Sequence, residues 1–157
     1  HPDGTRAVRD ALRARGVSVE DGSGLPGAGH VLLLTAQGEE TYDLVRDVDS
    51  PLLGITLDTG NFCWAGHPID TAHRFFERLA PLAVSVHVKD GRFVDGEWTL
   101  YPAGRGDIDL PGVFAALEAA GYDGAVVSEY EGEADFMAST TESVAYLRGL
   151  RDGRGLR

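Results

Sequence analysis

The sequence is poor in cysteine and in positive charge. Its 157 residues include one cysteine, Cys63, and 14 Lys and Arg against 25 Asp and Glu, for a net charge of −11. A single cysteine excludes an internal disulfide framework and favours a reducing, cytoplasmic compartment. No apolar run approaches the roughly 20 residues of a membrane span, so we expect no membrane partner. The acidic surface repels phosphate backbones and argues against nucleic acid as a partner.

The remaining composition fits one compact unit with a hydrophobic core. Hydrophobic residues make up 43% of the chain and charged residues 25%, and the 21 glycines are typical of many tight connections. The chain begins with His1, and its only methionine is Met137. We therefore expect the sequence to be a fragment, a cropped domain or a processed product.

Helix-like and strand-like segments alternate along the chain. Apolar spacing and Gly or Pro stops predict helices over 5–16, 39–48, 67–81, 110–121 and 134–151. Short β-prone runs predict strands over 17–20, 30–35, 52–58, 83–90 and 124–132, although 30–35 also fits a helix start. Asp95-Gly96, between β-prone residues, predicts a small hairpin. Strands that are apolar on both faces and alternate with helices are typical of an α/β fold, a parallel sheet covered by helices.

Three of the expected strands end in a residue that can bind a metal or transfer a proton. These residues are Asp58, His87 and Glu129, and parallel strands bring their carboxyl ends to one edge of a sheet. Two carboxylates and one imidazole suit Mn²⁺, Co²⁺, Mg²⁺ or Zn²⁺ without selecting among them. Each residue also has a structural explanation, since Asp58 fits a turn, His87 a core histidine and Glu129 a helix cap.

Four motifs carry a resemblance to a known family. In order and spacing, "GITLDTGNFCWAG", "VSVHVKD", "GRGDID" and "VVSEYEG" resemble the sugar phosphate isomerase/epimerase family with the xylose isomerase-like TIM barrel. The resemblance covers about residues 44–150 and is weakest over 1–43. It implies the C-terminal half, about four βα units, of a TIM (β/α)8 barrel, so we expect residues 1–157 to form a single partial domain. A half-barrel leaves sheet edges open, so we expect either a homo-oligomer or a missing N-terminal half-barrel.

The resemblance also implies a divalent metal held by Glu, Asp, His and Glu at the ends of four strands. Asp58, His87 and Glu129 match three of these positions, and two alignments compete for the fourth. In one alignment, "RGVSVEDGSG" supplies Glu20 as both ligand and catalytic carboxylate. In the other, "HVLLLTAQGEE" is the strand, and Thr35 stands at that position. A threonine hydroxyl is a poor ligand for a hard dication and cannot act as a carboxylate base.

Further residues are candidates for contacting a sugar or polyol substrate. A turn amide, a helix start or a solvated arginine would explain several of them equally well, and aromatic side chains can wall a pocket or cover the core. We expect the stretch 60–66 to form part of the pocket wall, Asp90 to support a ligand or a turn, and Cys63 to pack rather than react. The substrate-binding candidates are Asn61, Trp64, His67, Arg92 and Arg105.

The resulting hypothesis is a metal-dependent isomerase or epimerase of a sugar or polyol. Glu129 and Glu20 would remove and return a proton next to a carbonyl through an enediolate, and a dehydratase of a cyclic polyol would share that first step. The alternative is a catalytically inactive or incomplete barrel fragment that acts as a binding or assembly module. A metal-dependent phosphodiesterase is disfavoured by the acidic charge and by the small number of matched ligands.

Overall fold

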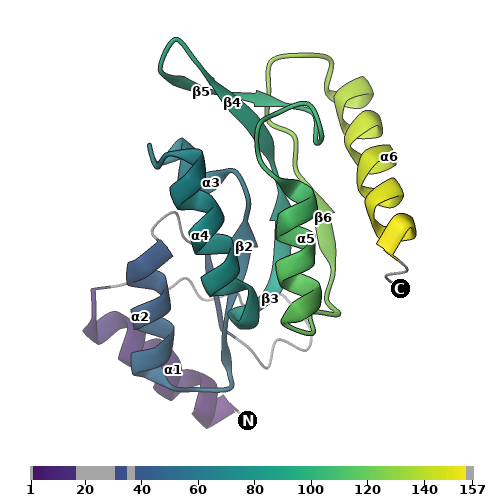
Figure 1. Ribbon diagram of the computed structural model, residues 1–157. Coiled ribbons are helices and arrows are strands. Elements are labelled where there is room, and N and C mark those ends of the chain that lie inside the picture. The colour runs from purple at the N-terminus through teal and green to yellow at the C-terminus, as the bar shows by residue number, and fades with distance from the viewer. Residues whose placement is uncertain (1, 17–30, 35–37, 155–157) are drawn as a thin grey trace.

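The computed structural model describes residues 2–16, 31–34 and 38–154 and contains a four-stranded parallel sheet (Figure 1). The strand order is β1-β2-β3-β6, and every neighbouring pair is parallel. A helix follows each strand in the sequence, which gives four βα units and confirms the predicted α/β fold. The strands are β1 (Val31–Leu34), β2 (Leu53–Asp58), β3 (Ala83–Val88) and β6 (Val126–Ser128).

Helices accompany the sheet as the apolar periodicity predicts. In Figure 1, α2, α4 and α5 run alongside the strands, and α6 lies beyond β6. No helix in the described ranges combines the length and apolarity needed to cross a bilayer. The helices are α1 (Pro2–Ala14), α2 (Gly38–Val48), the short α3 (Asn61–Trp64), α4 (Ile69–Leu79), the 3₁₀ turn η1 (Ala80–Leu82), α5 (Leu110–Ala119) and α6 (Phe136–Arg154).

A two-stranded hairpin projects from the end of the main sheet where β3 finishes (Figure 1). It consists of β4 (Asp90–Val94) and β5 (Glu97–Tyr101), paired antiparallel. Asp95 has φ 52° and Gly96 has φ 87°, so both turn residues adopt the left-handed conformation that a two-residue Asp-Gly hairpin requires. The hairpin predicted from Asp95-Gly96 is therefore confirmed.

The core lies between β2 and β3 and the helices that cover them. All six residues of β2 are buried, which explains why this strand is apolar on both faces. Phe62 packs against Phe75 and Phe76 with ring centroids 5.2 and 5.6 Å apart. The rings bury the first turn after β2 against α4, and this anchors the carboxyl end of the strand.

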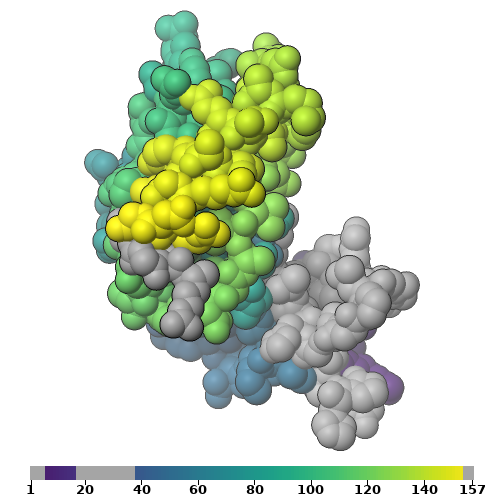
Figure 2. Space-filling model, turned by 90° about the vertical axis from the view of Figure 1, so that its right-hand side faces the viewer, coloured from purple at the N-terminus to yellow at the C-terminus, as the bar shows by residue number. Residues whose placement is uncertain are grey.

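The sheet stays open. Among the described strands, β1 and β6 have one neighbour each, so no closed barrel forms. Val84, Val126 and Val127 are 44%, 38% and 43% exposed, in contrast to the buried β2. Figure 2 shows α6, in yellow, running diagonally across the face that this view presents. By register, Val127 lies on the face of the sheet that carries His87, and Val84 and Val126 lie on the opposite face, so β3 and β6 have exposed apolar side chains on both faces.

Several sequence predictions need correction or fall outside the described residues. The strand expected over 124–132 extends only over Val126–Ser128, and the strand expected over 83–90 ends at Val88 because Asp90 begins the hairpin. The predicted strand over 30–35 is confirmed over Val31–Leu34. The predicted strand over 17–20 lies outside the described residues.

Candidate metal centre

Asp58 is the last residue of β2 and is 1% exposed. Its Oδ1 accepts hydrogen bonds from the backbone N–H groups of Gly60 and Asn61, at 2.9 and 3.0 Å. This is the turn that sequence alone also suggested for this aspartate. Its Oδ2 is buried and accepts no hydrogen bond from the described residues. Such an orphaned carboxylate oxygen is costly unless a cation or a ligand compensates it.

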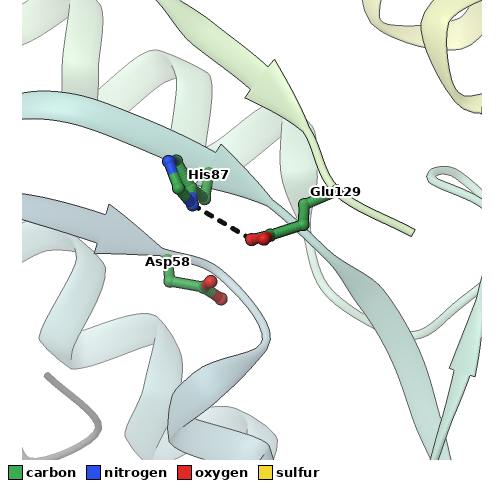
Figure 3. A group of neighbouring side chains, drawn as sticks. All are labelled: Asp58, His87 and Glu129. Carbon is green, nitrogen blue, oxygen red and sulfur yellow. Dashed lines mark hydrogen bonds and ion pairs between the residues drawn. The ribbon is translucent and has the colours of Figure 1, made fainter. Parts of the chain in front are cut away.

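His87 and Glu129 approach Asp58 from the next two strands (Figure 3). His87 is the register partner of Asp58 in the β2–β3 ladder, so the two side chains share a face of the sheet. Glu129 directly follows β6, and its N–H donates to the carbonyl oxygen of Val88 at 3.0 Å. One ligand atom from each of the three residues lies within 4.8 Å of the others. We call Asp58, His87 and Glu129 the triad.

A direct contact links two members of the triad. His87 Nδ1 lies 3.0 Å from Glu129 Oε2, and both side chains are about one third exposed. Thr59, which is fully buried, fixes the neighbouring backbone: its N–H donates to the His87 carbonyl, and its hydroxyl accepts from the Lys89 N–H. The ends of β2 and β3 are thus held together, and Figure 3 shows the three side chains converging between them.

Lys89 brings a positive charge to the same oxygens. Its Nζ lies 3.5 Å from Asp58 Oδ2, 3.4 Å from Glu129 Oε2 and 2.8 Å from Glu131 Oε2, and its side chain is only 12% exposed. Sequence reasoning assigned no role to Lys89 or Glu131. A signal was present, because residues two apart on an extended segment share a side, as His87 does with Lys89.

Burial and charge shift the pKa values of these groups in opposing ways. Burial raises the pKa of Asp58 above its ordinary value, although Lys89 and the two backbone amides pull it down. Burial lowers the pKa of Lys89, but the hydrogen bond with Glu131 and the charges of Asp58 and Glu129 outweigh it and raise the pKa overall. Lys89 is therefore an ammonium at neutral pH, while burial disfavours the ionised form of Asp58.

The donor set fits a divalent cation. Two carboxylates and one imidazole, presented from three adjacent strand ends, are ligands that Mn²⁺, Co²⁺, Zn²⁺ and Mg²⁺ accept. Asp58 Oδ2 is buried, accepts no hydrogen bond from the described residues and lies 3.5 Å from an ammonium, so it is able to bind a divalent cation. The described residues supply three such ligands and do not by themselves choose the ion.

Both alternatives for the fourth ligand, Glu20 and Thr35, lie outside the described residues. The strand that pairs with β2 is β1, and the residues that follow it in sequence, 35–37, contain no carboxylate. The choice between the Thr35 and Glu20 alignments stays open. Glu20 as a ligand or as a catalytic carboxylate stays a prediction.

Two of the predicted substrate residues, His67 and Arg92, have ring contacts outside the triad. His67 packs edge-on against Phe75 with centroids 5.2 Å apart, and Trp64 is 68% exposed at the end of α3. Arg92 stacks over Tyr101. The backbone N–H of Asn61 donates a hydrogen bond to Asp58 Oδ1. The contacts described for the side chains of Trp64 and Arg92 do not reach the triad, and the substrate role of all four residues stays a prediction.

Arg105 also has its partner elsewhere, and two other residues of the region belong to the core. Arg105 Nε lies 2.5 Å from Glu142 Oε1 on α6. Within the stretch 60–66, Phe62 is 0% exposed and belongs to the core, and the prediction that this stretch forms part of the pocket wall stays a prediction. Burial raises the pKa of the Cys63 thiol to about 11, which fits the prediction that it packs rather than reacts.

Asp90 does not support the triad by any described contact. Its Oδ1 accepts from the N–H groups of Gly91 and Ile108, and its Oδ2 accepts from those of Gly104 and Gly106, at 2.8 to 3.3 Å. The side chain is 2% exposed. Of the two roles considered for Asp90, the structure shows the turn role, since it holds the loop 104–108 against the start of the hairpin.

A cavity of about 500 Å³ lies elsewhere, between α5, β6 and α6. Phe114, Leu117 and Leu147 contribute to its lining, together with charged residues such as Arg148, and no member of the triad lines it. The cavity has volume but no convergent set of ligand atoms. We therefore place the candidate site at the triad.

Comparison with known proteins identifies similar sequences and folds. The family described as the xylose isomerase-like TIM barrel matches residues 25–150. The uncharacterized protein MJ1311 of Methanocaldococcus jannaschii is 32% identical over 112 residues, which cover 69% of this chain and 36% of that protein.

Solved structures give the same fold. A xylose isomerase-like TIM barrel protein from Mycobacterium smegmatis, in complex with magnesium, aligns with a TM-score of 0.67 and 16% identity over 95% of this chain and 49% of its own. A D-tagatose 3-epimerase-like protein aligns with a TM-score of 0.56 and 25% identity over 90% of this chain and 49% of its own. The chain therefore spans about half the length of these solved relatives.

Proposed function

Because the chain belongs to the xylose isomerase-like TIM barrel family, we propose that it forms part of a divalent-metal-dependent isomerase or epimerase of a sugar or polyol. The observation that carries the proposal is the convergence of Asp58, His87 and Glu129, with ligand atoms within 4.8 Å of one another. The D-tagatose 3-epimerase-like neighbour supports the reaction class, and the magnesium-bound neighbour supports a metal in this fold.

Asp58, His87 and Glu129 would hold the ion, with Glu20 as a predicted fourth ligand. A divalent ion at this position supplies fixed positive charge beside a substrate carbonyl and so favours loss of the adjacent C–H proton. Because Asp58 Oδ1 is engaged by two backbone amides, its Oδ2 remains directed to the site. The rigid turn thus fixes the carboxylate before any ligand arrives.

Glu129 is the candidate group for moving the proton. It is partly exposed and lies next to His87, which orients its Oε2. Removal of a proton from the carbon beside the carbonyl leaves an enediolate, and return of a proton to the other face gives the epimer. Glu20 is the predicted second carboxylate, and Asn61, Trp64, His67, Arg92 and Arg105 are the predicted substrate contacts. The same first step serves a dehydratase of a cyclic polyol.

We also propose that a partner covers the face of the sheet that carries the triad. Val127, on the face of the sheet that carries His87, is 43% exposed, and an open sheet edge can pair with a partner strand. A second half-barrel, from a longer chain or from another copy, would cover this face. Measurement of the oligomeric mass in solution distinguishes a monomer from a homo-oligomer.

The test combines metal binding with proton exchange. The protein is loaded with Mn²⁺ or Co²⁺, and ketohexoses in D₂O are followed by NMR for deuterium incorporation next to the carbonyl. We expect incorporation with the wild-type protein and loss with Glu129→Gln. Arg78→Met, which removes a surface charge that pairs with Glu39, is the matched control and should retain exchange.

The same experiment separates the enzyme from its alternative. Metal bound at one ion per chain with no exchange on any sugar or polyol would favour a binding or assembly module that has kept the metal centre. A folded protein that binds no divalent ion at all would overturn the proposed function.

A further inference from the structure

Lys89 is the only lysine in the sequence, and it lies where a cation is expected. Its ammonium faces Asp58 Oδ2 at 3.5 Å and Glu129 Oε2 at 3.4 Å, two of the oxygens that the triad offers to an ion. The first of these oxygens accepts no hydrogen bond from the described residues, so the ammonium is its only described positive neighbour. All other basic side chains outside the histidines are arginines.

Backbone contacts hold Lys89 next to the end of β2. The Thr59 hydroxyl accepts from the N–H of Lys89 and donates to its carbonyl, so the residue is tied to the end of β2 from both sides. A Cβ at Gly60 would lie 2.6 Å from the Lys89 Cβ, so only glycine lets the two segments approach this closely. At 12% exposure, the Lys89 side chain is not a solvated surface charge.

Glu131 offers the ammonium a second location. Its Oε2 lies 2.8 Å from Lys89 Nζ, closer than either triad oxygen, and its side chain is 56% exposed. Glu131 and Glu129 are two residues apart, and the ammonium contacts both. A divalent ion at the triad would repel an ammonium a few ångströms away, because like charges in a partly buried site are poorly screened. The ammonium would keep Glu131 as its partner and leave the other two carboxylates.

We propose that Lys89 is a built-in cation that occupies the metal position of the triad, and that Glu131 is the positioning residue that receives its ammonium when a divalent ion binds. This inference rests on the proposed metal centre and adds that metal binding is an exchange of one cation for another. Without Lys89, the carboxylates of Asp58, Glu129 and Glu131 would repel one another. With it, that repulsion is reduced, and metal affinity is lowered in return.

The test is a double-mutant cycle read by Mn²⁺ affinity, using calorimetry at fixed pH on the full chain. Lys89→Met keeps the length of the aliphatic stem and removes the charge, and we expect it to tighten binding by at least about tenfold. Glu131→Gln should weaken binding at least about threefold. In the Lys89→Met background, Glu131→Gln should change affinity less than twofold, because Glu131 acts through the ammonium. Arg78→Met removes a positive charge that is paired with Glu39, and it should leave affinity unchanged.

A second measurement observes Lys89 itself without substituting it. Labelling with [¹⁵N]lysine gives one side-chain Nζ signal, since the chain has one lysine. Addition of Zn²⁺ should shift this signal in the wild-type protein and leave it in place in Asp58→Asn.

The outcomes separate the two proposals. If Lys89→Met binds Mn²⁺ with the affinity of the wild type and the Nζ signal does not shift, the cation exchange is overturned. The proposed metal centre is then unaffected. An effect of Glu131→Gln that persists without Lys89 overturns the role of Glu131, since it would then act as a simple charge. If neither the wild-type protein nor folded Lys89→Met binds a divalent ion, the exchange and the proposed function both fail.

Discussion

Two buried aspartates, Asp58 at the end of β2 and Asp90 at the start of β4, differ in what their oxygens contact. Both are at most 2% exposed, and burial raises the pKa of each. Both oxygens of Asp90 accept backbone N–H groups, four in all, so the carboxylate is satisfied by its own loop. Asp58 satisfies only Oδ1 in this way and leaves Oδ2 orphaned beside Lys89.

The difference shows that burial alone does not mark a functional carboxylate. A buried aspartate whose hydrogen bonds are complete stabilises a loop, whereas one with an unused oxygen keeps a position for a cation. One oxygen of Asp58, Oδ1, stabilises the turn, and the other, Oδ2, is available to bind a cation. Substitution by asparagine should therefore lower metal affinity at Asp58 and lower the free energy of unfolding at Asp90.

The largest effect is expected for Asp58→Asn on metal affinity. Loss of the carboxylate ligand should weaken Mn²⁺ binding by about 1000-fold or more, since even groups behind the ligands cost 10- to 100-fold. Asparagine keeps the Oδ1 acceptor, and it removes an ionised group that burial disfavours, so the thermal midpoint should not fall. Calorimetric titration and thermal unfolding without metal check both parts. A variant that binds Mn²⁺ as the wild type does would remove Asp58 from the metal centre.

The next effect is expected for Asp90→Asn on stability. One carboxylate oxygen becomes an NH₂ group that faces two backbone N–H donors, which leaves buried amides unsatisfied. The free energy of unfolding should fall by about 2–4 kcal/mol, measured by urea denaturation. Metal affinity of the folded variant should stay within about threefold of wild type. If stability is unchanged and metal is lost, the contrast between the two aspartates is wrong.

A smaller loss is expected for Gly106→Ala, in the loop that Asp90 holds. The added Cβ would lie 2.1 Å from Asp90 Oδ1 and 2.4 Å from the Gly91 backbone, so the loop must shift. Overpacking of this kind costs about 1–3 kcal/mol. Urea denaturation measures it, and Gly149→Ala, at a position with open space around the glycine, is the control that should not destabilise.

The smallest effect is expected for Arg105→Ala. Its ion pair with Glu142 joins two exposed side chains, so the free energy of unfolding should change by less than about 1 kcal/mol. If Arg105 binds substrate, KM should rise while Mn²⁺ affinity stays constant. An unchanged KM would mean that the arginine is only a surface residue, like most arginines at such exposure.

Sequence pattern predicted the elements whose causes are local. The hairpin at Asp95-Gly96 follows from backbone conformations that few other residue pairs adopt, and the buried strand β2 follows from an unbroken apolar run. The ends of β3 and β6 were placed less well. The limits of these strands depend on where the backbone hydrogen bonds with the neighbouring strand end, and that neighbour is distant in sequence.

The sequence by itself determined the alternation of strands and helices and the chemistry of the three strand-end residues, because periodicity and residue type are local properties. Only the tertiary structure decided that Asp58 keeps an unused oxygen while Asp90 keeps none, and that Lys89 and Glu131 join the triad. Those facts depend on backbone amides and charges up to 42 residues apart, which meet only when the parallel strands are in register.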